Sequence, residues 1–273
     1  MNHMTGIDLT VNANEIVIAY DDFGNGKLPI IFVHGFPFDK SSWQPQLELL
    51  SKQHRTIAYD IRGFGKSGDG AETPSIFLYA RDLIAFMDVL EIDKAVVCGL
   101  SMGGYILLNA VALFPDRFAA VILCDTQCIS DTPEVKAGRS KTIDLIKSGG
   151  KKEFADGFIK KLFSATTFET KPEVVSAINQ TILGTDDATI MGTLSALAER
   201  DEMCGTLSKI TVPVLILCGE SDVITPLDQS KLMKSKIPNA TLHSIGEAGH
   251  LSNLEQPDIF SEHISQFLSK MTG

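Results

Sequence analysis

The stretch AVVCGLSMGGYILLNA, residues 95–110, places a serine between glycines, and it decides how the rest of the chain is interpreted. Apolar residues run up to Gly99, as in a buried strand, and a helical pattern follows Ser101. Gly99 and Gly103 lack a Cβ atom, so another backbone segment can approach them closely. In α/β sheets, ligands bind beyond the carboxyl ends of the strands. The pattern therefore predicts that Ser101 lies on a tight, strained turn in a ligand-binding crevice.

A serine hydroxyl is a poor nucleophile unless a neighbouring base takes its proton, and histidine is the usual base. His250 lies in the loop GEAGHLSNLEQP (246–257), between the last predicted strand and the last predicted helix. Of the other histidines, His3 lies in the terminal segment and His54 among polar residues. His243 lies inside a predicted strand and His263 inside a predicted helix. His34 is expected to hold its own loop by hydrogen bonds. We therefore predict that His250 is the base.

The imidazole of such a base is held in one tautomer by an acceptor at its other nitrogen. The segment VLILCGESDVITP (214–226) places Asp222 just after a buried strand, and we predict that Asp222 is this acceptor. Asp125, which follows the strand-like run 118–124, is the alternative, and Glu220 is expected to cap or pair locally.

Attack on a carbonyl group also requires hydrogen-bond donors for the oxygen that becomes negative. The N–H of Met102, first in the helix after the serine, is one candidate, and the helix N-terminus favours negative charge there. The second candidate is the N–H of Phe36, in the loop His34-Gly35-Phe36-Pro37. Pro37 has no N–H to donate. We predict that Phe36 and Met102 form an oxyanion hole.

Short apolar runs alternate with longer amphipathic stretches along most of the chain. This alternation predicts an α/β fold with a mostly parallel sheet and helices on both faces. Strands are expected at 15–20, 30–33, 55–60, 95–99, 118–124, 214–219 and 241–245, with an eighth near 6–12. Helices are expected at 43–51, 75–91, 102–114, 227–236 and 256–270.

The region 129–210 breaks this alternation, because it contains helical patterns and no strand-like run. We expect helices at 134–148, 151–163, 172–184 and 187–200, forming a helical cap inserted into a core of residues 1–128 and 211–273. Four phenylalanines in the cap either line a cavity or hold the inserted helices together: Phe154, Phe158, Phe163 and Phe168.

Five motifs resemble those of the α/β-hydrolase superfamily across nearly the whole chain: HGFP (34–37), DIRGFGKS (60–67), GLSMGG (99–104), GESDVITP (219–226) and GHLSNLEQP (249–257). The order serine, acid, histidine is also that of this superfamily. The resemblance implies an α/β-hydrolase fold with Ser101 as nucleophile, His250 as base and Asp222 as acid. It gives DIRGFGKS a structural role. Within the superfamily, the chain is similar to 3-oxoadipate enol-lactonases and their esterase and perhydrolase relatives.

The expected function is a serine hydrolase that cleaves small to medium carboxylic esters or lactones through an acyl-enzyme on Ser101, with no cofactor or metal. The candidate substrate-binding walls, which are also candidates for plain core, are Phe38, Trp43, Tyr105, Ile224 and Leu251. Perhydrolysis, carbon–carbon bond hydrolysis and a slow signalling receptor remain alternatives on the same fold. The oligomeric state is left open.

The bulk composition restricts the partners. The formal net charge of −10 disfavours nucleic acid, whose phosphates it would repel. The polar start MNHMTGIDLTVNANE does not resemble a signal peptide, and no apolar run is long enough to predict a membrane span. The odd number of cysteines and their lack of paired spacing argue against a disulfide framework or a zinc site and favour a reducing cytoplasm: Cys98, Cys124, Cys128, Cys204 and Cys218.

Overall fold

The strands form one eight-stranded sheet in the order β1-β2-β4-β3-β5-β6-β7-β8. The computed structural model describes residues 5–271, so His3 and the first residues of the polar start lie outside it. The strands are β1 (Gly6–Ala13), β2 (Ile16–Phe23), β3 (Ile30–Val33), β4 (Thr56–Tyr59), β5 (Ala95–Leu100), β6 (Phe118–Cys124), β7 (Val214–Gly219) and β8 (Ala240–Ile245). β1 and β2 pair antiparallel, and the strands from β4 to β8 in the sheet pair in parallel. The prediction of a mostly parallel sheet is confirmed.

One strand differs from the expectation. The run at 241–245 was expected to be a buried strand, but only the last residue of β8 is buried. The physical reason is its position: β8 is an edge strand, so it has a neighbour on one side only.

The parallel register brings the carboxyl ends of the central strands to one edge of the sheet. Val33 at the end of β3 pairs with Gly99 of β5. Leu100 of β5 pairs with Cys124 of β6, and Cys124 pairs with Leu217 of β7. The loops that follow these four strands therefore begin side by side, although they are far apart in the sequence.

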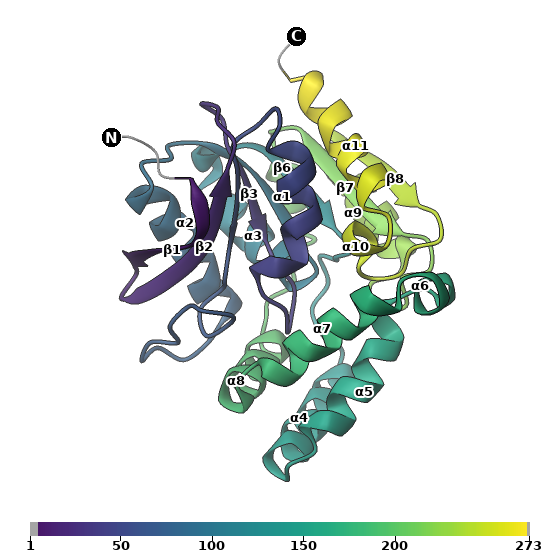
Figure 1. Cartoon of the computed structure of the whole chain (residues 1–273). Coiled ribbons are helices and arrows are strands. Elements are labelled where there is room, and N and C mark those ends of the chain that lie inside the picture. Colours follow the sequence, from purple (N-terminus) through teal and green to yellow (C-terminus); the bar gives the residue numbers. More distant parts are fainter. Residues whose placement is uncertain (1–4, 272–273) are drawn as a thin grey trace.

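Apolar side chains that alternate along the strands divide the interior into two clusters. On β5, Val97 belongs to the cluster under α2 (Ile76–Val89) and α3 (Met102–Leu113). Val96 and Cys98 belong to the cluster under α1 (Gln44–Leu50) and α11 (Pro257–Ser269). Helices consequently cover both faces of the sheet, with α1 and α11 in front in Figure 1.

The remaining helices are α4 (Pro133–Lys147), α5 (Lys151–Leu162), α6 (Ala165–Thr170), α7 (Pro172–Gly184), α8 (Asp187–Ala198), α9 (Leu227–Lys236) and α10 (Ser252–Glu255). Helix starts follow local chemistry: the side chains of Ser75 and Asp186 accept hydrogen bonds from the first N–H groups of α2 and α8. α3 ends just before Pro115, as expected, because proline cannot continue the hydrogen-bond ladder.

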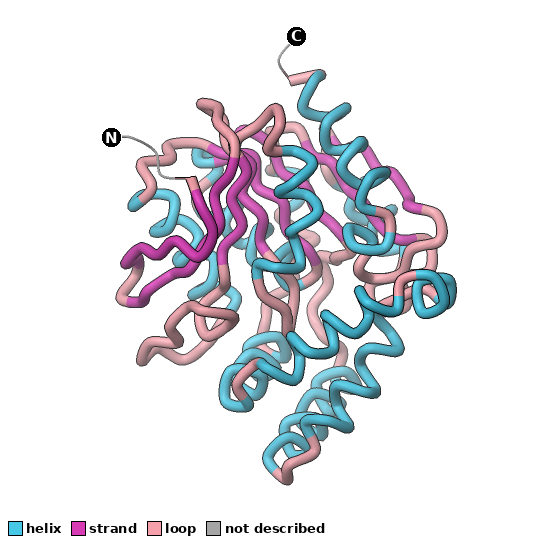
Figure 2. The backbone as a smooth tube through the Cα atoms, in the orientation of Figure 1, coloured by secondary structure: helices cyan, strands magenta, loops and turns pink. Residues whose placement is uncertain are grey.

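Helices α4 to α8 lie between β6 and β7 in the sequence, within the range expected for the cap. They lie beyond the end of the sheet in Figure 1, and loops occupy the zone between sheet and cap in Figure 2. The short helix α6 was not expected, because the segment 164–172 is rich in threonine and polar residues that are typical of a linker.

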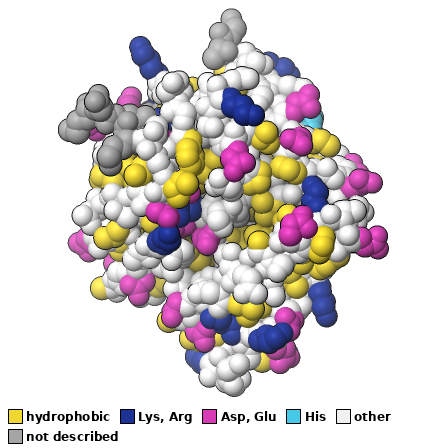
Figure 3. Space-filling view, viewed as in Figure 1, with side chains coloured by type: hydrophobic (Ala, Val, Ile, Leu, Met, Phe, Trp, Pro, Cys, Tyr) yellow, Lys and Arg dark blue, Asp and Glu magenta, His cyan; other side chains and the backbone are white. Residues whose placement is uncertain are grey.

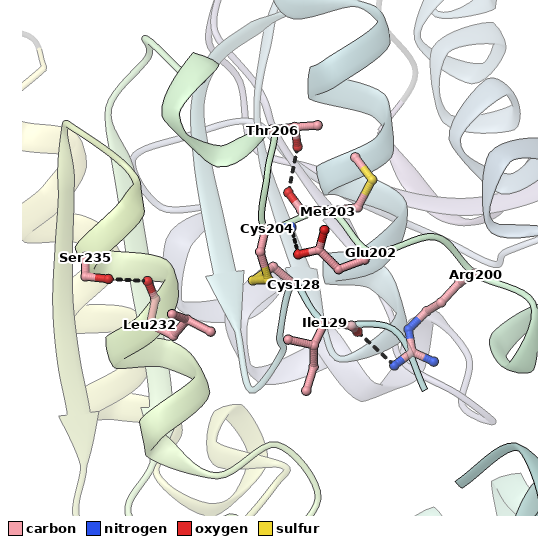
Figure 4. Close-up of a disulfide and its surroundings, with 9 residues drawn as sticks. All are labelled: Cys128, Ile129, Arg200, Glu202, Met203, Cys204, Thr206, Leu232 and Ser235. Carbon is pink, nitrogen blue, oxygen red and sulfur yellow. Dashed lines mark hydrogen bonds between the residues drawn. A yellow bond between two sulfur atoms is a disulfide. The ribbon is translucent and has the colours of Figure 1, made fainter. Parts of the chain in front are cut away.

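A disulfide joins Cys128 to Cys204, which corrects the expectation of free cysteines. Cys128 follows β6 and Cys204 precedes β7, so the bond ties together the two segments through which the chain enters and leaves the cap (Figure 4). Spacing could not reveal this pair, since its members are 76 residues apart. The other three cysteines are free and buried, and the cysteines no longer favour a reducing compartment.

None of the helices within residues 5–271 is both long and apolar enough to cross a membrane. On the face in Figure 3, lysine, arginine, aspartate and glutamate side chains are interspersed, so this face carries no extended patch of one sign.

We predict that reducing the Cys128–Cys204 bond lowers the free energy of unfolding by about 2–4 kcal/mol, because the bond closes a long loop in the unfolded chain. Thermal unfolding with and without dithiothreitol measures the effect. The double variant Cys128→Ser/Cys204→Ser is the control and should show no response to the reductant. An identical Tm of the wild type in both conditions would contradict the prediction.

Candidate active site

The turn between β5 and α3 holds Ser101 in a left-handed backbone conformation, with φ 53° and ψ −113°. A Cβ atom at Gly99 would lie 2.4 Å from the carbonyl oxygen of Gly103, and one at Gly103 would lie 2.2 Å from that of Val33. Both positions therefore exclude any larger residue. The close approach predicted from the sequence is present, and it keeps Ser101 at the carboxyl edge of the sheet.

Ser101, His250 and Asp222 form a continuous hydrogen-bonded chain. The Nε2 atom of His250 lies 2.9 Å from Ser101 Oγ, and its Nδ1 atom lies 2.8 Å from Asp222 Oδ2. The three residues come from the loops after β5, β8 and β7, and each is at most 9% exposed. The structure thus brings together the three side chains that the sequence predicted.

Asp222 is held as a carboxylate. Burial opposes its ionisation, but the charge of His250 and hydrogen bonds from His250 and Thr225 outweigh burial and lower the pKa of Asp222 to about 2. Oδ1 accepts hydrogen bonds from the N–H groups of Ile224 and Thr225, and Oδ2 accepts one from Thr225 Oγ1. A carboxylate can only accept, so His250 Nδ1 carries the hydrogen and Nε2 is left to accept from Ser101.

Asp125, the alternative acid, does not contact His250. Instead, its Oδ1 atom lies 2.7 Å from the backbone N of Gly219, and its Oδ2 atom lies 2.5 Å from Ser252 Oγ. Glu220 was expected to cap or pair locally, but it accepts a hydrogen bond from Ser244 on the neighbouring strand β8. The geometry therefore favours Asp222 over Asp125 as the partner of His250.

The loop after β3 lies close to the serine turn, since a Cβ atom at Gly35 would be 3.3 Å from Ser101 Cβ. His34 is buried and holds this loop, since its Nε2 accepts from the N–H of Ile61 and its Nδ1 donates to the carbonyl oxygen of Gly35. Burial lowers the pKa of His34, which keeps it neutral for these two bonds. Met102 begins α3, so its N–H has no partner within the helix. Phe36 and Met102 both line the cavity at Ser101.

A cavity of about 470 Å³ opens over Ser101 and His250. Its walls are mainly apolar and come from both the core and the cap: Phe36, Tyr105, Phe154, Phe158, Leu194, Leu197 and Ile224. Tyr105 and Ile224 therefore lie where the sequence predicted. The four cap phenylalanines have two different roles. Phe154 and Phe158 line the cavity, whereas Phe163 and Phe168 pack against each other with ring centroids 6.1 Å apart.

Three predicted wall residues are corrected. Phe38, Trp43 and Leu251 are fully buried in the core cluster under α1 and α11, and the cavity lining does not include them. The ring of Trp43 packs against those of Phe32 and Phe260, at centroid distances of 4.9 and 6.0 Å. Closeness in sequence to Phe36 and His250 was misleading, because these three side chains pack into the core cluster and not against the cavity.

Apart from Phe154 and Phe158, the cap residues of the wall were missed by the sequence analysis, although helical spacing could have found them. Val135, Arg139 and Thr142 recur every three or four positions on α4. Phe154, Phe158 and Lys161 do so on α5, and Leu194 and Leu197 on α8. One face of each of these helices therefore meets the cavity.

Two basic side chains, Arg139 and Lys161, interrupt the apolar wall. Arg139 shares the carboxylate of Asp131 with Arg200, which also lies over the ring of Tyr105 at 4.4 Å. One carboxylate faces two guanidinium groups, so this side of the cavity keeps an excess positive charge. Lys161 is exposed, and within residues 5–271 it has no ion-pair partner.

The histidine loop is also bonded to the cap. The N–H of His250 donates to the carbonyl oxygen of Leu162 at the end of α5, at 2.8 Å. The carboxylate of Glu255 accepts from the N–H groups of Gly249 and Ser164, at 2.6 and 2.7 Å. The position of the cap is therefore coupled to that of His250.

Two groups of described residues bring potential metal ligands together. Cys128 and Cys204 of the first group are joined as a disulfide, so they offer no thiolates. In the second group, burial raises the pKa of the Cys218 thiol, and Asp125 and Asp222 already accept hydrogen bonds from protein donors. Neither group presents a free set of ligands.

The chain belongs to the α/β-hydrolase family. A family profile described as alpha/beta hydrolase fold matches residues 29–257, which confirms the fold and the resemblance inferred from the motifs.

Two relatives are similar over nearly the whole chain. The 3-oxoadipate enol-lactonase 2 of Acinetobacter baylyi is 29% identical over 262 residues, 96% of each chain. A thermophilic esterase from Thermogutta terrifontis, solved with malate bound, is 33% identical, with a TM-score of 0.92 over 96% of this chain and 98% of its own.

A third similar structure is the enol-lactonase from Burkholderia xenovorans LB400, at 28% identity and a TM-score of 0.89 over 96% of this chain and 100% of its own. The protein is therefore a hydrolase of the α/β family with lactonase and esterase homologues.

We predict that an organophosphorus reagent labels Ser101 at a rate that depends on pH, because a protonated imidazole cannot accept the serine proton. Asp222 remains ionised over the pH range of the measurement, since its pKa is about 2. Labelling rates between pH 5 and 9 measure the effect, with Ser101→Ala as the unlabelled control. A rate independent of pH would contradict a histidine base.

Proposed function

We propose that this protein is a serine hydrolase that cleaves small to medium carboxylic esters or lactones through an acyl-enzyme on Ser101. The observation that carries the proposal is the position of the His250 ring, 2.9 Å from Ser101 Oγ on one side and 2.8 Å from Asp222 Oδ2 on the other. Similarity to enol-lactonases and an esterase supports the same reaction class.

In the first half-reaction, Ser101 Oγ attacks the ester carbonyl carbon while His250 Nε2 takes the hydroxyl proton. The imidazolium that forms lies against the carboxylate of Asp222, which stabilises its charge. The tetrahedral intermediate then collapses, the bond to the leaving oxygen breaks, and His250 returns the proton to that oxygen. The products are an alcohol and an acyl-enzyme; from a lactone, both remain in one molecule.

In the second half-reaction, water replaces the alcohol. His250 takes a proton from the water, the hydroxide attacks the acyl carbon, and the proton returns to Ser101 Oγ as the acid leaves. In both halves the N–H groups of Phe36 and Met102 stabilise the negative carbonyl oxygen. Loss of one such donor typically raises the barrier by about 3 kcal/mol.

The cavity supports a finer assignment, to esters or lactones whose acyl part carries a carboxylate. Apolar side chains from the core and the cap favour a carbon chain next to the ester, while Arg139 and Lys161 on the cap favour a negative group farther away. The esterase from Thermogutta terrifontis is described with malate, a dicarboxylate, bound.

We predict that the wild type hydrolyses p-nitrophenyl acetate and butyrate with many turnovers and that Ser101→Ala loses at least about 10³-fold in kcat. Release of p-nitrophenol at 400 nm, the absorbance of its anion, measures both proteins. Equal rates would remove Ser101 from the mechanism. One product per protein molecule would favour a receptor, and turnover only with peroxide would favour perhydrolysis.

We predict that the anionic mono-p-nitrophenyl ester of succinic acid has a higher kcat/KM than the butyrate ester, because its carboxylate pairs with the cap. Lys161→Gln should lower kcat/KM for the succinate ester by about tenfold and leave the butyrate ester nearly unchanged. Lys160→Gln is the matched control, since Lys160 lies beside Lys161 on α5 but not on the cavity wall.

An equal loss on both esters in Lys161→Gln would instead indicate a general effect on the cap. A preference of the wild type for the neutral ester would remove the assignment to anionic substrates.

A further inference from the structure

The end of β6 contacts each of the three segments that carry Ser101, Asp222 and His250. The carbonyl oxygen of Cys124 accepts a hydrogen bond from the N–H of Ser101 at 2.9 Å. Thr126 Oγ1 donates to the carbonyl oxygen of Ser101 at 2.8 Å. Residues 124–126 therefore bind both the backbone N–H and the backbone carbonyl group of Ser101.

Asp125, between these two residues, reaches the other two segments. Its Oδ1 accepts from the N–H of Gly219, at the end of β7 and three residues before Asp222. Its Oδ2 lies 2.5 Å from the Oγ of Ser252, two residues after His250. Asp125 is 0% exposed, and it has a left-handed φ of 43°, which is sparsely populated for a residue with a Cβ atom.

The surroundings of Asp125 disfavour a second negative charge. Oxygen atoms of Asp125 and Asp222 and the sulfur of Cys218 all lie within 4.8 Å of one another. Burial raises the pKa of Asp125 well above its usual range, and the charges of Asp222 and Glu255 raise it further. Hydrogen bonds from Ser252 and Gly219 lower this pKa, but they do not outweigh burial. Burial also raises the pKa of the neighbouring thiol of Cys124.

We propose that Asp125 is a positioning residue that works as a neutral carboxylic acid. Its Oδ1 accepts from the N–H of Gly219, and its own proton lies in the 2.5 Å contact with Ser252 Oγ, where an ionised Asp125 would instead accept a hydrogen bond from Ser252. One bond fixes the segment that leads to Asp222, and the other fixes the loop that carries His250. Two adjacent buried acids thus have opposite states: Asp222 is ionised because His250 and Thr225 stabilise its charge, and Asp125 is protonated. The catalytic consequence rests on the proposed function.

Replacement of Asp125 by asparagine and by alanine separates the neutral from the ionised state. An asparagine side chain reproduces the neutral acid, because its carbonyl can accept from Gly219 and its amide N–H can donate to Ser252. Asp125→Asn should keep kcat on p-nitrophenyl butyrate within about twofold of the wild type. Asp125→Ala should lower kcat by about tenfold or more with little change in KM, because Asp125 does not contact the substrate cavity.

Thermal unfolding tests the protonation state without any substrate. An acid held neutral in the fold binds more protons than it does unfolded at every pH between its unfolded pKa of about 3.9 and its raised folded pKa. The wild type therefore loses stability relative to Asp125→Asn as the pH rises through this window. Asp125→Asn should have a Tm higher than the wild type by about 3 °C or more at pH 8, and this difference should shrink toward pH 4.

The opposite outcomes would overturn the proposal. A lower Tm of Asp125→Asn at pH 8 would mean that Asp125 is ionised, and wild-type kcat in Asp125→Ala would mean that it positions nothing. If Asp125→Ala does not fold, Ser252→Ala removes only the bond to the histidine loop and should lower kcat without changing KM; an unchanged kcat would then count against the proposal.

A wild type that turns over no ester would refute the proposed function and leave the Tm comparison intact, so the two failures are distinguishable.

Discussion

The close approach of the first turn of α3 to the ends of β3 and β5 is the constraint on which the rest of the site depends. The backbone at Gly103 lies so near the carbonyl oxygen of Val33 that no Cβ atom fits between them. This contact forces Ser101 into a left-handed conformation and presents its Oγ atom at the carboxyl edge of the sheet. Every other functional group is positioned relative to that oxygen by loops that leave the same edge.

The same edge concentrates buried acidic groups, and the structure assigns them different surroundings. Asp222 has an imidazole and a hydroxyl group to stabilise its charge, whereas Asp125 has only one N–H and one hydroxyl oxygen. The difference in partners, rather than in burial, separates their ionisation, because both are nearly inaccessible to water. A neutral Asp125 at the end of β6 therefore holds the active-site loops in place without adding a second negative charge near His250.

The cap contributes both chemistry and coupling. Its helices supply most of the wall opposite Ser101 and both of its basic side chains. It is also joined to the core near the active site, through the bond from His250 N–H to Leu162 and through the disulfide at its base. A change in the cap therefore affects substrate fit and the placement of the histidine together, which is consistent with relatives of one fold acting on different substrates.

By itself, the sequence determined the alternation of strands and helices, the serine turn, and the acid and histidine that follow later strands, since these depend on local apolar periodicity and on glycine and loop positions. The tertiary structure alone decided which side chains face the cavity. Trp43 and Leu251 lie in the core and Arg139 and Lys161 on the wall, because packing between distant helices selects the face that each presents. It also decided the pairing of Cys128 with Cys204 across the cap, since this pairing joins segments 76 residues apart and no local pattern records the distance between them.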